Sequence, residues 1–426
     1  MKHRPVAIDL FAGCGGISLG LEAAGFDIGL AVEFDAIHAL VHHCNFPYCK
    51  TLCRDISRLG SDEIRAALRG NGYDSDIDLI AGGPPCQGFS HIGKRQLDDP
   101  RNSLVFEYLR IVSDLRPRYF LFENVPGIAS GDHRQFLEEL IQEFEGLGYH
   151  ITQPIRILDA SEYGAPQRRK RLILIGSRIG ETQAKYPTAR YGECSGYVQD
   201  MFSGEILPFA TAGDALEDLA PIEVYTEEDA GIDCGRLDYR GYRARYNIQP
   251  SSTFSKCHVR DIGERIYGHF GSLHTQESIA RFAATVPGSV EPRSRFFKLA
   301  KGGLCNTLRA GTHSDKGAYT APRPIHYSEP RCISIREAAR LHTFPDWFQP
   351  HRTIWHGFRE IGNAVVPALA KELGDSILRA LGIDSKDLAT YKLAPVSSQL
   401  LSYNMSQASA YWGIADDVIP KRRRAA

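Results

Sequence analysis

Hydrophobic and polar positions follow two alternating patterns over the first 178 residues. Short apolar runs, typical of buried strands, are followed by segments whose apolar residues recur every three or four positions, as on one face of a helix. The expected strands are 6–11, 28–34, 76–83, 118–125 and 171–178, and the expected helices are 17–26, 36–44, 102–115 and 134–149. This alternation predicts an α/β fold with a parallel sheet, helices on both faces, and ligands beyond the carboxyl ends of the strands.

The pattern weakens in residues 179–330, which are richer in Gly, Pro, Ser, Tyr and Arg. This composition predicts a smaller, loop-rich second domain. Order returns where Ser334 and Glu337 form an S-x-x-E capping box, the start of a helix. Residues 363–381 have the apolar periodicity of one further helix. The final segment, 386–426, is expected to be peripheral, with its basic end (KRRR) frayed, and contact of that end with phosphates is the alternative.

Composition limits the class of protein. Hydrophobic residues make up 43% and charged residues 24% of the 426 positions, as in soluble globular proteins. The first residues lack the long apolar core of a signal peptide, and no apolar run reaches membrane-spanning length, so a cytoplasmic protein without a membrane partner is expected. The ten scattered cysteines favour thiols over a disulfide framework. Net charge is −1, but residues 251–325 hold eleven Lys and Arg against five Asp and Glu, which fits either a basic binding face or a solvated surface.

A glycine-rich turn follows the first expected strand, in DLFAGCGG (9–16). Gly13, Gly15 and Gly16 allow close approach of a ligand to the backbone. Glu33 ends the second expected strand, where nucleotide-binding sheets place a carboxylate against ribose hydroxyls. The spacing is not G-x-G-x-x-G, so an adenosine-containing ligand without a pyrophosphate is favoured over a dinucleotide, with a purely structural turn as the alternative. Asp55, expected just before the edge of a third strand, is a candidate partner for an adenine amino group.

A second candidate is Cys86, in AGGPPCQGFS (81–90). Pro84 and Pro85 fix the backbone before it, and the polar segment 87–101 after it is expected to move. A positioned thiol beside a closing loop suits a nucleophile. A small buried hydrophobe is the equally weighted alternative.

Polar residues also end the later strands. Glu123 and Asn124 follow an apolar run, so the carboxyl group is a candidate acid or the partner of a nearby base. Gln167, Arg169 and Arg171 alternate along an expected strand, which places their side chains on one face. Arginine forks there would hold a carbonyl or phosphates, or form a solvated edge.

Together these residues resemble the DNA (cytosine-5)-methyltransferase family of the bacterial type. The matching stretches are DLFAGCGG, Glu33, Asp55, GGPPCQGFS, ENV (123–125), QRRKR (167–171), REAARLHTFPDWF (336–348) and GNAVVP (362–367). They stand in the family's order and span Ile8 to Leu381, interrupted by 179–330.

The resemblance implies S-adenosylmethionine as methyl donor. Phe11 would stack on its adenine, Glu33 would hold its ribose, and Asp55 would read the adenine edge. The implied donor pocket comprises Phe11, Gly13, Gly15, Gly16, Glu33, Phe34, Asp55, Ile56, Pro85, Leu104, Asn363 and Ala364. Because Asn363 is far along the chain, the last helix must fold back onto the first domain.

The resemblance also implies the chemistry. Cys86 would be the thiolate that adds to carbon 6 of cytosine, and Glu123 would bond ring N3 and the exocyclic amine. Asn124 would brace its segment. Arg171 would bond the base carbonyl, while Arg169 and Gln167 would hold the loop and backbone. The cytosine would be flipped out of duplex DNA, with 87–101 closing over it.

Four regions are implied. They are a Rossmann-like catalytic domain (1–178), a target-recognition domain (179–345), a return to the catalytic domain (346–385) and a C-terminal extension (386–426). Candidate DNA contacts are Arg293, Arg295, Lys298, Lys301 and Arg309. The expected protein is a monomer in the cytoplasm, associated with the nucleoid. It would act on duplex DNA as an orphan enzyme or beside a cognate restriction endonuclease.

Rival interpretations are weaker. Cys44, Cys49 and Cys53 have the wrong spacing for a zinc finger. Amino-group methyltransferases carry an aromatic residue where this chain has Cys86. A transfer RNA methyltransferase of the same family is a closer rival, against which the long 179–330 insert favours DNA. A catalytically silent DNA-binding relative is disfavoured by Cys86, Glu123 and Arg171.

Overall fold

The computed structural model describes most of the chain. The described residues are 4–85, 103–131, 133–193, 199–200, 204–219, 221–222, 232–233, 258–260, 265–311, 323–388, 391–393 and 398–415. Cys86, the predicted closing segment 87–101 and the basic end at 421–424 lie outside these residues.

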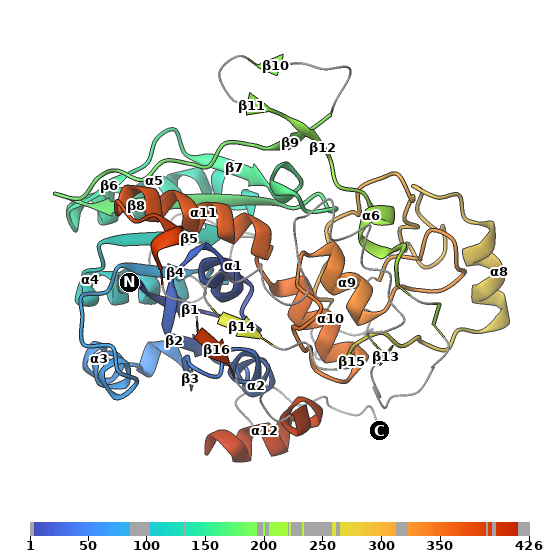
Figure 1. Cartoon of the computed structure of the whole chain (residues 1–426), viewed down its shortest axis with the longest axis horizontal. Helices are drawn as coiled ribbons and strands as arrows, with labels where there is room; N and C mark the ends of the chain where they lie inside the picture. Colours follow the sequence, from blue (N-terminus) through green and yellow to red (C-terminus); the bar gives the residue numbers. More distant parts are fainter. Residues whose placement is uncertain are drawn as a thin grey trace.

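Eight strands of the described chain form one central sheet in the order β3-β2-β1-β4-β5-β8-β6, with β7 paired to another part of β8 (Figure 1). The strands are β1 Val6–Leu10, β2 Asp27–Glu33, β3 Lys50–Cys53, β4 Leu79–Gly82, β5 Tyr119–Asn124, β6 Tyr149–Ile151, β7 Arg156–Asp159 and β8 Lys170–Arg178. The strand order reverses between β1 and β4. The loops that leave these two strands therefore open at the switch point where such sheets bind ligands.

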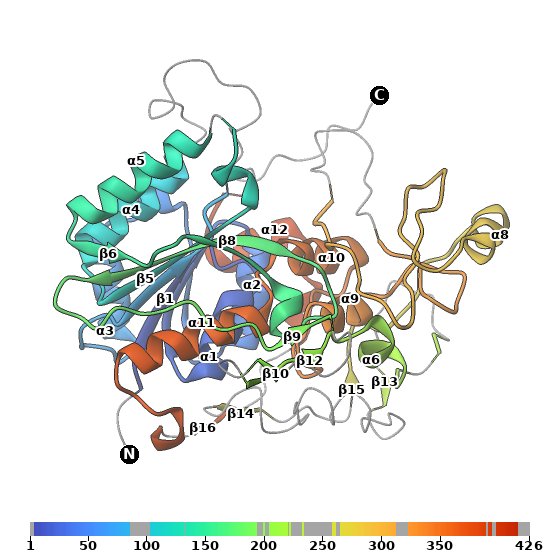
Figure 2. The ribbon, with the colours of Figure 1, turned by 90° about the horizontal axis from the view of Figure 1, so that it is seen from above.

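Helices cover both faces of the sheet, as predicted (Figure 2). On one side lie α1 Gly16–Ala24, α2 Ala36–Asn45 and α11 Pro367–Ala380, and on the other lie α3 Ser61–Gly70, α4 Ser103–Leu115 and α5 His133–Gly146. The strands divide their side chains accordingly: Leu79 and Ala81 join the core of α1 and α11, and Ile80 joins that of α4 and α5. No helix of the described chain is long and apolar enough to cross a membrane.

The prediction of a wholly parallel sheet is wrong at one edge. β8 runs antiparallel to β5, and β6 and β7 run antiparallel to β8. Between β7 and β8 the chain holds only the single turn η4, Ala160–Tyr163. A parallel neighbour would need a crossover of a dozen or more residues, so this short connection forces β7 and β8 to run antiparallel.

Two further local predictions need correction. The one helix predicted over residues 363–381 is confirmed but begins later, since α11 covers Pro367–Ala380 and Asn363 is the last residue of α10 (Ile354–Asn363). Pro367 occupies the first position of α11 and favours extended backbone before it, as Ala364 and Val366 show. Asp55 follows β3 instead of preceding it, and its side chain caps η1, Ile56–Arg58.

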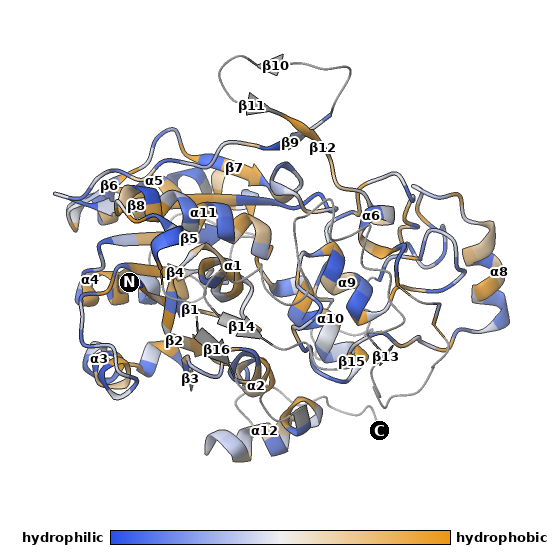
Figure 3. Ribbon diagram, in the orientation of Figure 1, coloured by the Kyte–Doolittle hydropathy of each residue, from blue (hydrophilic) through white to orange (hydrophobic). Residues whose placement is uncertain are grey.

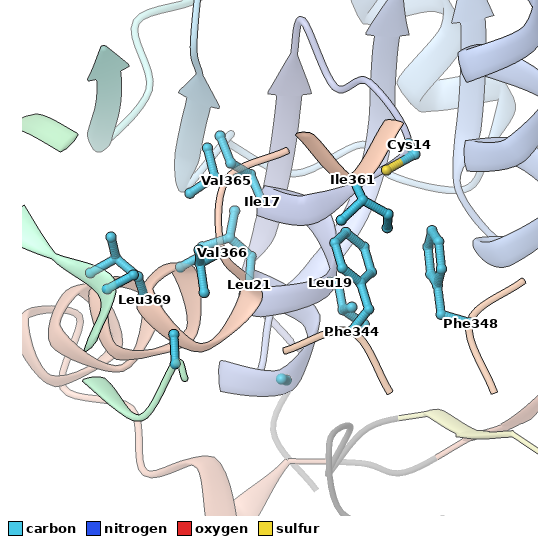
Figure 4. Close-up of a cluster of buried hydrophobic side chains, with 14 of the residues drawn as sticks. Cys14, Ile17, Leu19, Leu21, Phe344, Phe348, Ile361, Val365, Val366 and Leu369 are labelled. Carbon is cyan, nitrogen blue, oxygen red and sulfur yellow. The ribbon is translucent and has the colours of Figure 1, made fainter. Parts of the chain in front are cut away.

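Close packing of α1 against α11 joins the two ends of the sequence, as expected from the fold-back of the last helix. A Cβ atom added at Gly20 would overlap Ala370, and one added at Gly374 would lie 2.8 Å from the Cβ of Ala24. Ile17 and Leu21 of α1 face the start of α11 in the core around this seam (Figure 4). Glycine at these sites therefore lets the two helices approach closely.

The second part of the chain contains short elements, as predicted. Its helices are α6 Ala212–Leu216, α8 Gln276–Ala284 and α9 Ile335–Leu341, and its strands are β9 Tyr191–Gly192, β10 Gln199–Asp200, β11 Gly204–Glu205, β12 Leu207–Pro208, β13 Ile232–Asp233, β14 His258–Arg260 and β15 Arg265–Ile266. The capping box of Ser334 and Glu337 starts α9, as predicted. Because α9 contacts both α6 and α10, the proposed domain division at 345 stays a prediction.

The C-terminal segment is less peripheral than expected. Its described elements are η7 Ser385–Asp387, β16 Tyr391–Leu393, η8 Ser398–Ser402 and α12 Met405–Trp412. Both η8 and α12 cover the outer face of α2, where Ala408 is fully buried against Ile37 and Leu40. Hydropathy colouring shows both hydrophobic and hydrophilic positions along α12 (Figure 3). Trp412 also donates its indole N–H to the carbonyl of Ala36 at 3.0 Å.

Candidate active site

The loop after β1 adopts an unusual backbone at the switch point of the sheet. Phe11, Gly13 and Gly15 have φ values of 60°, 57° and 102°. Phe11 has a side chain, so its left-handed conformation is uncommon and marks a position held by its surroundings. Ala12 donates to the carbonyl of Val32 on β2 at 3.0 Å, which ties the loop to the sheet.

The three predicted glycines have different surroundings. A Cβ at Gly15 would overlap the ring of Phe46, and one at Gly16 would overlap the carbonyl of Val365. Nothing lies within 4 Å of a Cβ at Gly13. Gly15 and Gly16 thus serve close packing within the protein, whereas Gly13 borders open space.

Glu33 organises this loop from the end of β2. Its carboxylate accepts the N–H of Gly13 and the N–H of Asp35, each at 2.8 Å. Burial raises the pKa of Glu33 to about 7. Asp35 caps α2 and accepts a 2.7 Å bond from Arg359 of α10. The acid predicted from its distance to Gly13 is therefore at the loop, in a chain of contacts that reaches α10.

A buried polar network, not identified from the sequence, lies beneath the same loop. Asp9 accepts the backbone N–H of Ser18 at 3.0 Å and its hydroxyl at 2.6 Å. The hydroxyl oxygen of Ser18 lies 2.9 Å from Nε2 of His42, whose Nδ1 lies 3.1 Å from the hydroxyl of Thr51. Burial raises the pKa of Asp9 to about 7 and lowers that of His42 to about 3. The available signal was a single acid inside the apolar run VAIDLF.

The other predicted donor residues lie around this loop. Phe11, Ile56 and Leu104 contribute to one apolar cluster, whereas Phe34 is 43% exposed. Ala364 follows α10 directly and would lie 3.0 Å from a Cβ at Gly16. The remaining predicted residues are Pro85 and Asn363, both exposed, and Asp55, which accepts from the backbone and hydroxyl of Ser57.

The ends of β4 and β5 meet at the same edge. Gly82 pairs with Phe122, so Gly83 lies beside Glu123, where a Cβ would be 2.5 Å from its carboxylate. Asn124 donates to the carbonyl of Pro84 at 3.1 Å. The segment that leads directly into Cys86 is thereby bound to the end of β5.

Arg171 completes this edge. Its Nε lies 2.6 Å from Oε1 of Glu123, and the two side chains are 14% and 12% exposed. Glu123 therefore has a nearby base as its partner, which was one of the two alternatives raised from the sequence. The other alternative, that Glu123 acts as an acid, stays a prediction. A partly open carboxylate–guanidinium pair presents acceptors and donors side by side, as recognition of a planar polar ring requires.

Gln167 and Arg169 point elsewhere. Both precede β8 and are buried, and both bind backbone of segments far away in sequence. Arg169 donates to the carbonyls of Leu308 at 2.8 Å, Gly362 at 2.8 Å and Ala364 at 3.0 Å. The prediction that they share one strand face with Arg171 is wrong, because β8 begins only at Lys170.

The five basic residues that were predicted to contact DNA lie in different environments. Lys298 is buried and its Nζ donates to the carbonyls of Phe282 and Ala283, so its selection as a DNA contact is wrong. Arg293 pairs with Glu277, and Lys301 pairs with Glu217. Arg295 and Arg309 are exposed. A sequence window counts charges without showing which side chains turn inward.

The cysteine-rich stretch runs from the end of α2 to the end of β3. Cys49 and Cys53 are buried and Cys44 is half-buried. Within the described chain, no group of three or more His, Cys, Asp or Glu residues is arranged to hold a metal ion.

Comparison with known proteins gives consistent matches. A sequence model of the family described as C-5 cytosine-specific DNA methylase matches residues 6–379. The Type II methyltransferase M.XorII of Xanthomonas oryzae pv. oryzae is 45% identical over 434 residues, covering 99% of this chain and 95% of that protein. The Type II methyltransferase M.DdeI of Desulfomicrobium norvegicum is 33% identical over 398 residues, covering 87% of this chain and 88% of that protein.

Solved structures agree. A crystal structure described as a prophage-encoded DNA modification methyltransferase from E. coli is 31% identical, with a TM-score of 0.68, and covers 89% of this chain and 99% of that chain. The S. pombe Dnmt2 methyltransferase is 16% identical, with a TM-score of 0.56, and covers 89% of this chain and 100% of that chain. The latter likeness shows a shared fold alone.

Proposed function

Because the chain belongs to the C-5 cytosine-specific DNA methylase family, we propose that it methylates a flipped-out cytosine through a covalent adduct with Cys86. The enzyme class, a C-5 cytosine DNA methyltransferase that uses S-adenosylmethionine, follows from the family. The observation that supports the proposed mechanism is the pair of Glu123 and Arg171, set beside the segment that ends in Cys86.

The reaction divides among these residues. The thiolate of Cys86 forms a bond to carbon 6 of cytosine, and the electron pair of the 5,6 double bond makes carbon 5 nucleophilic. Glu123 bonds ring N3 and the exocyclic amine as charge develops there, and Arg171 bonds the base carbonyl. Carbon 5 would take the methyl group as the methyl–sulfur bond of the donor breaks, which releases S-adenosylhomocysteine, and a base would then remove the proton on carbon 5. That C–H electron pair restores the double bond as the carbon–sulfur bond breaks.

The donor S-adenosylmethionine supplies the electrophilic methyl group. The residues present fit it, because open space lies beside Gly13 and the carboxylate of Glu33 stands at the same edge. In the proposed pocket Glu33 holds the ribose hydroxyls and Phe11 stacks on the adenine. Gly15 and Gly16 shape the loop by packing against the protein. The other pocket residues are Phe34, Asp55, Ile56, Pro85, Leu104, Asn363 and Ala364.

The substrate is proposed to be duplex DNA read by the 179–345 part of a monomeric enzyme. Flipping is required because carbon 6 cannot be reached inside a base stack. Exposed Arg295 and Arg309 are the better-placed basic candidates for contacts with DNA. The relatives M.XorII and M.DdeI are named Type II methyltransferases. We therefore infer that a restriction endonuclease of the same specificity accompanies this enzyme.

The mechanism is tested by trapping. The protein is incubated with S-adenosylmethionine and duplex DNA in which 5-fluorocytosine replaces cytosine, since fluorine at carbon 5 blocks the final proton loss. A protein–DNA adduct stable to denaturant is expected with the native chain and with Cys44→Ser. None is expected with Cys86→Ser, which keeps donor binding.

The test also includes unmodified DNA and RNA, each incubated with S-adenosylmethionine whose methyl group is labelled. Label in 5-methylcytosine of duplex DNA is expected. Label on adenine or on RNA alone, or turnover by Cys86→Ser, would refute the proposal.

A further inference from the structure

Two side chains join the second part of the chain to the loop region of the sheet. The peptide of Leu308 is bound from both sides, since its N–H donates to Oε1 of Gln167 at 2.9 Å and its carbonyl accepts from Arg169 at 2.8 Å. Arg169 continues to the carbonyls of Gly362 and Ala364.

Gln167 also contacts His342, a histidine that lies outside the candidate catalytic and donor sets. The side-chain amide nitrogen of Gln167 lies 3.0 Å from Nδ1 of His342, and Nε2 of His342 lies 2.9 Å from the carbonyl of Ala364. Both side chains are fully buried. Leu308 and Ala364 are therefore joined by two parallel links.

The direction of every hydrogen bond in the second link is fixed by its ends. The N–H of Leu308 requires an oxygen on Gln167, which leaves the amide nitrogen of Gln167 facing His342. That nitrogen donates, so Nδ1 of His342 accepts, and Nε2 carries the proton given to Ala364. A neutral imidazole with its proton on Nε2 satisfies both partners, and an imidazolium would not.

One end of the link, Ala364, lies next to the glycine loop, and the other end, Leu308, lies in a segment that packs against the end of α10. A Cβ at Gly16 would overlap the carbonyl of Val365, so the backbone just after Ala364 rests on the glycine loop. A Cβ at Gly362 would overlap the backbone of Ala310, so the 308–310 segment lies against the end of α10.

We propose that His342 is a positioning residue that transmits occupancy of the methyl-donor pocket to the 303–311 segment of the recognition region. The inference rests on the proposed function in one respect, that Ala364 borders the donor. An ordered donor fixes the Ala364 carbonyl, and the link through His342 and Gln167 then fixes Leu308. The recognition segment is thereby held before DNA is engaged.

Hydrogen exchange of the whole protein, with and without S-adenosylhomocysteine, tests this link. In the native chain the ligand is expected to slow exchange at least fivefold in peptides covering 303–311. His342→Phe keeps the aromatic volume and loses both hydrogen bonds. It is expected to bind the ligand within about threefold of the native Kd, measured by calorimetry, while protection of 303–311 falls to about half or less, because only the link through Arg169 remains. His342→Gln offers a carbonyl and an amide in place of the two ring nitrogens and should restore it.

The matched control is His269→Phe, which removes a buried histidine bonded to Ser334 outside the link. It should leave the protection intact. Protection of 303–311 that stays at the native level in His342→Phe, or that is reduced equally in His269→Phe, would overturn the proposal.

A second test uses the native protein, so its outcome does not depend on whether any variant folds. With nitrogen-15 histidine, His342 is expected to give the spectrum of a neutral ring protonated on Nε2, and protonation on Nδ1 would refute the link. Failure to trap DNA on Cys86 would defeat the proposed mechanism and leave both of these readouts unaffected.

Discussion

The carboxylate of Glu123 and the guanidinium of Arg171 lie 2.6 Å apart across two antiparallel strands, β5 and β8. Neither side chain is closed off from solvent at the sheet edge. We expect Glu123→Gln to reduce kcat by about 10²-fold or more, since an amide cannot give ring N3 a proton as negative charge develops there. Arg171→Lys keeps a positive charge without the planar fork and should fall between the native enzyme and Arg171→Ala.

The measurement is single-turnover methylation with saturating donor. Glu138→Gln, which removes an exposed acid paired with Arg134 on α5, is the control and should retain native rates. An unchanged rate in Glu123→Gln would contradict the assignment.

Donor binding should depend on pH through Glu33. Burial raises the pKa of Glu33 to about 7, so below that pH the acid is protonated and accepts fewer hydroxyl hydrogen bonds. The Kd for S-adenosylhomocysteine is expected to rise as the pH falls from 8 to 6. Glu33→Gln should bind more weakly and show a flatter pH profile. Calorimetry at several pH values measures both, and an equal pH dependence in Glu33→Gln would rule out this residue as the origin.

Asp9 should make stability depend on pH in the opposite sense from an ordinary ion-paired acid. Burial raises its pKa from 3.8 to about 7, so the folded state holds a proton that the unfolded state has lost between these values. The contribution of Asp9 to stability therefore falls as the pH rises from about 4 to 7 and is constant above. Asp9→Asn should remove this slope. Urea unfolding at pH 5 and pH 8 gives the comparison, and identical slopes in both proteins would contradict it.

The close packing at Gly16 and Gly20 of α1 predicts that an added methyl group at either position destabilises the fold. Gly16→Ala and Gly20→Ala should each lower the free energy of unfolding by about 1–3 kcal/mol, because the new methyl group meets Val365 or Ala370. Gly70→Ala at the end of α3 meets nothing within 4 Å and is the matched control, expected to be neutral or slightly stabilising. Thermal unfolding of the three variants measures the difference, and equal melting temperatures would refute the seam.

The C-terminal segment should stabilise the donor side of the sheet. Trp412→Ala removes both an apolar contact with α2 and the bond to Ala36, with an expected loss of about 2–3 kcal/mol. Because α2 begins just after Phe34 and Asp35, donor affinity should weaken as well. Tyr411→Ala is the comparison, since it removes an exposed ring that contacts His43 at the surface of α2 and leaves the bond to Ala36 in place. A melting temperature no lower than that of Tyr411→Ala would contradict the prediction.

The sequence predicted those parts of the fold and site that depend on local spacing. Strand–helix alternation gave the layered sheet, and the distance from Gly13 placed Glu33 at the loop. Strand direction was predicted wrongly for β8, because its local pattern of apolar residues is the same in either direction. The helix break at Pro367 was readable from the proline itself.

What the sequence could not supply were pairings between distant buried polar groups. Nothing local to His342 indicates Gln167, and nothing local to Lys298 indicates that its amine turns toward the carbonyl of Phe282. Such partners are selected by the complete fold, since a buried donor or acceptor takes whichever group the packing brings near.

The packing of α1 against the chain that leads into α11 also determines when, during synthesis, the donor loop can be completed. Gly16 leaves the ribosome early, and its packing partner Val365 is made some 350 positions later. At about 5–20 residues per second, the two meet only after tens of seconds of synthesis. A nascent chain therefore lacks a packed donor loop until Val365 has been made.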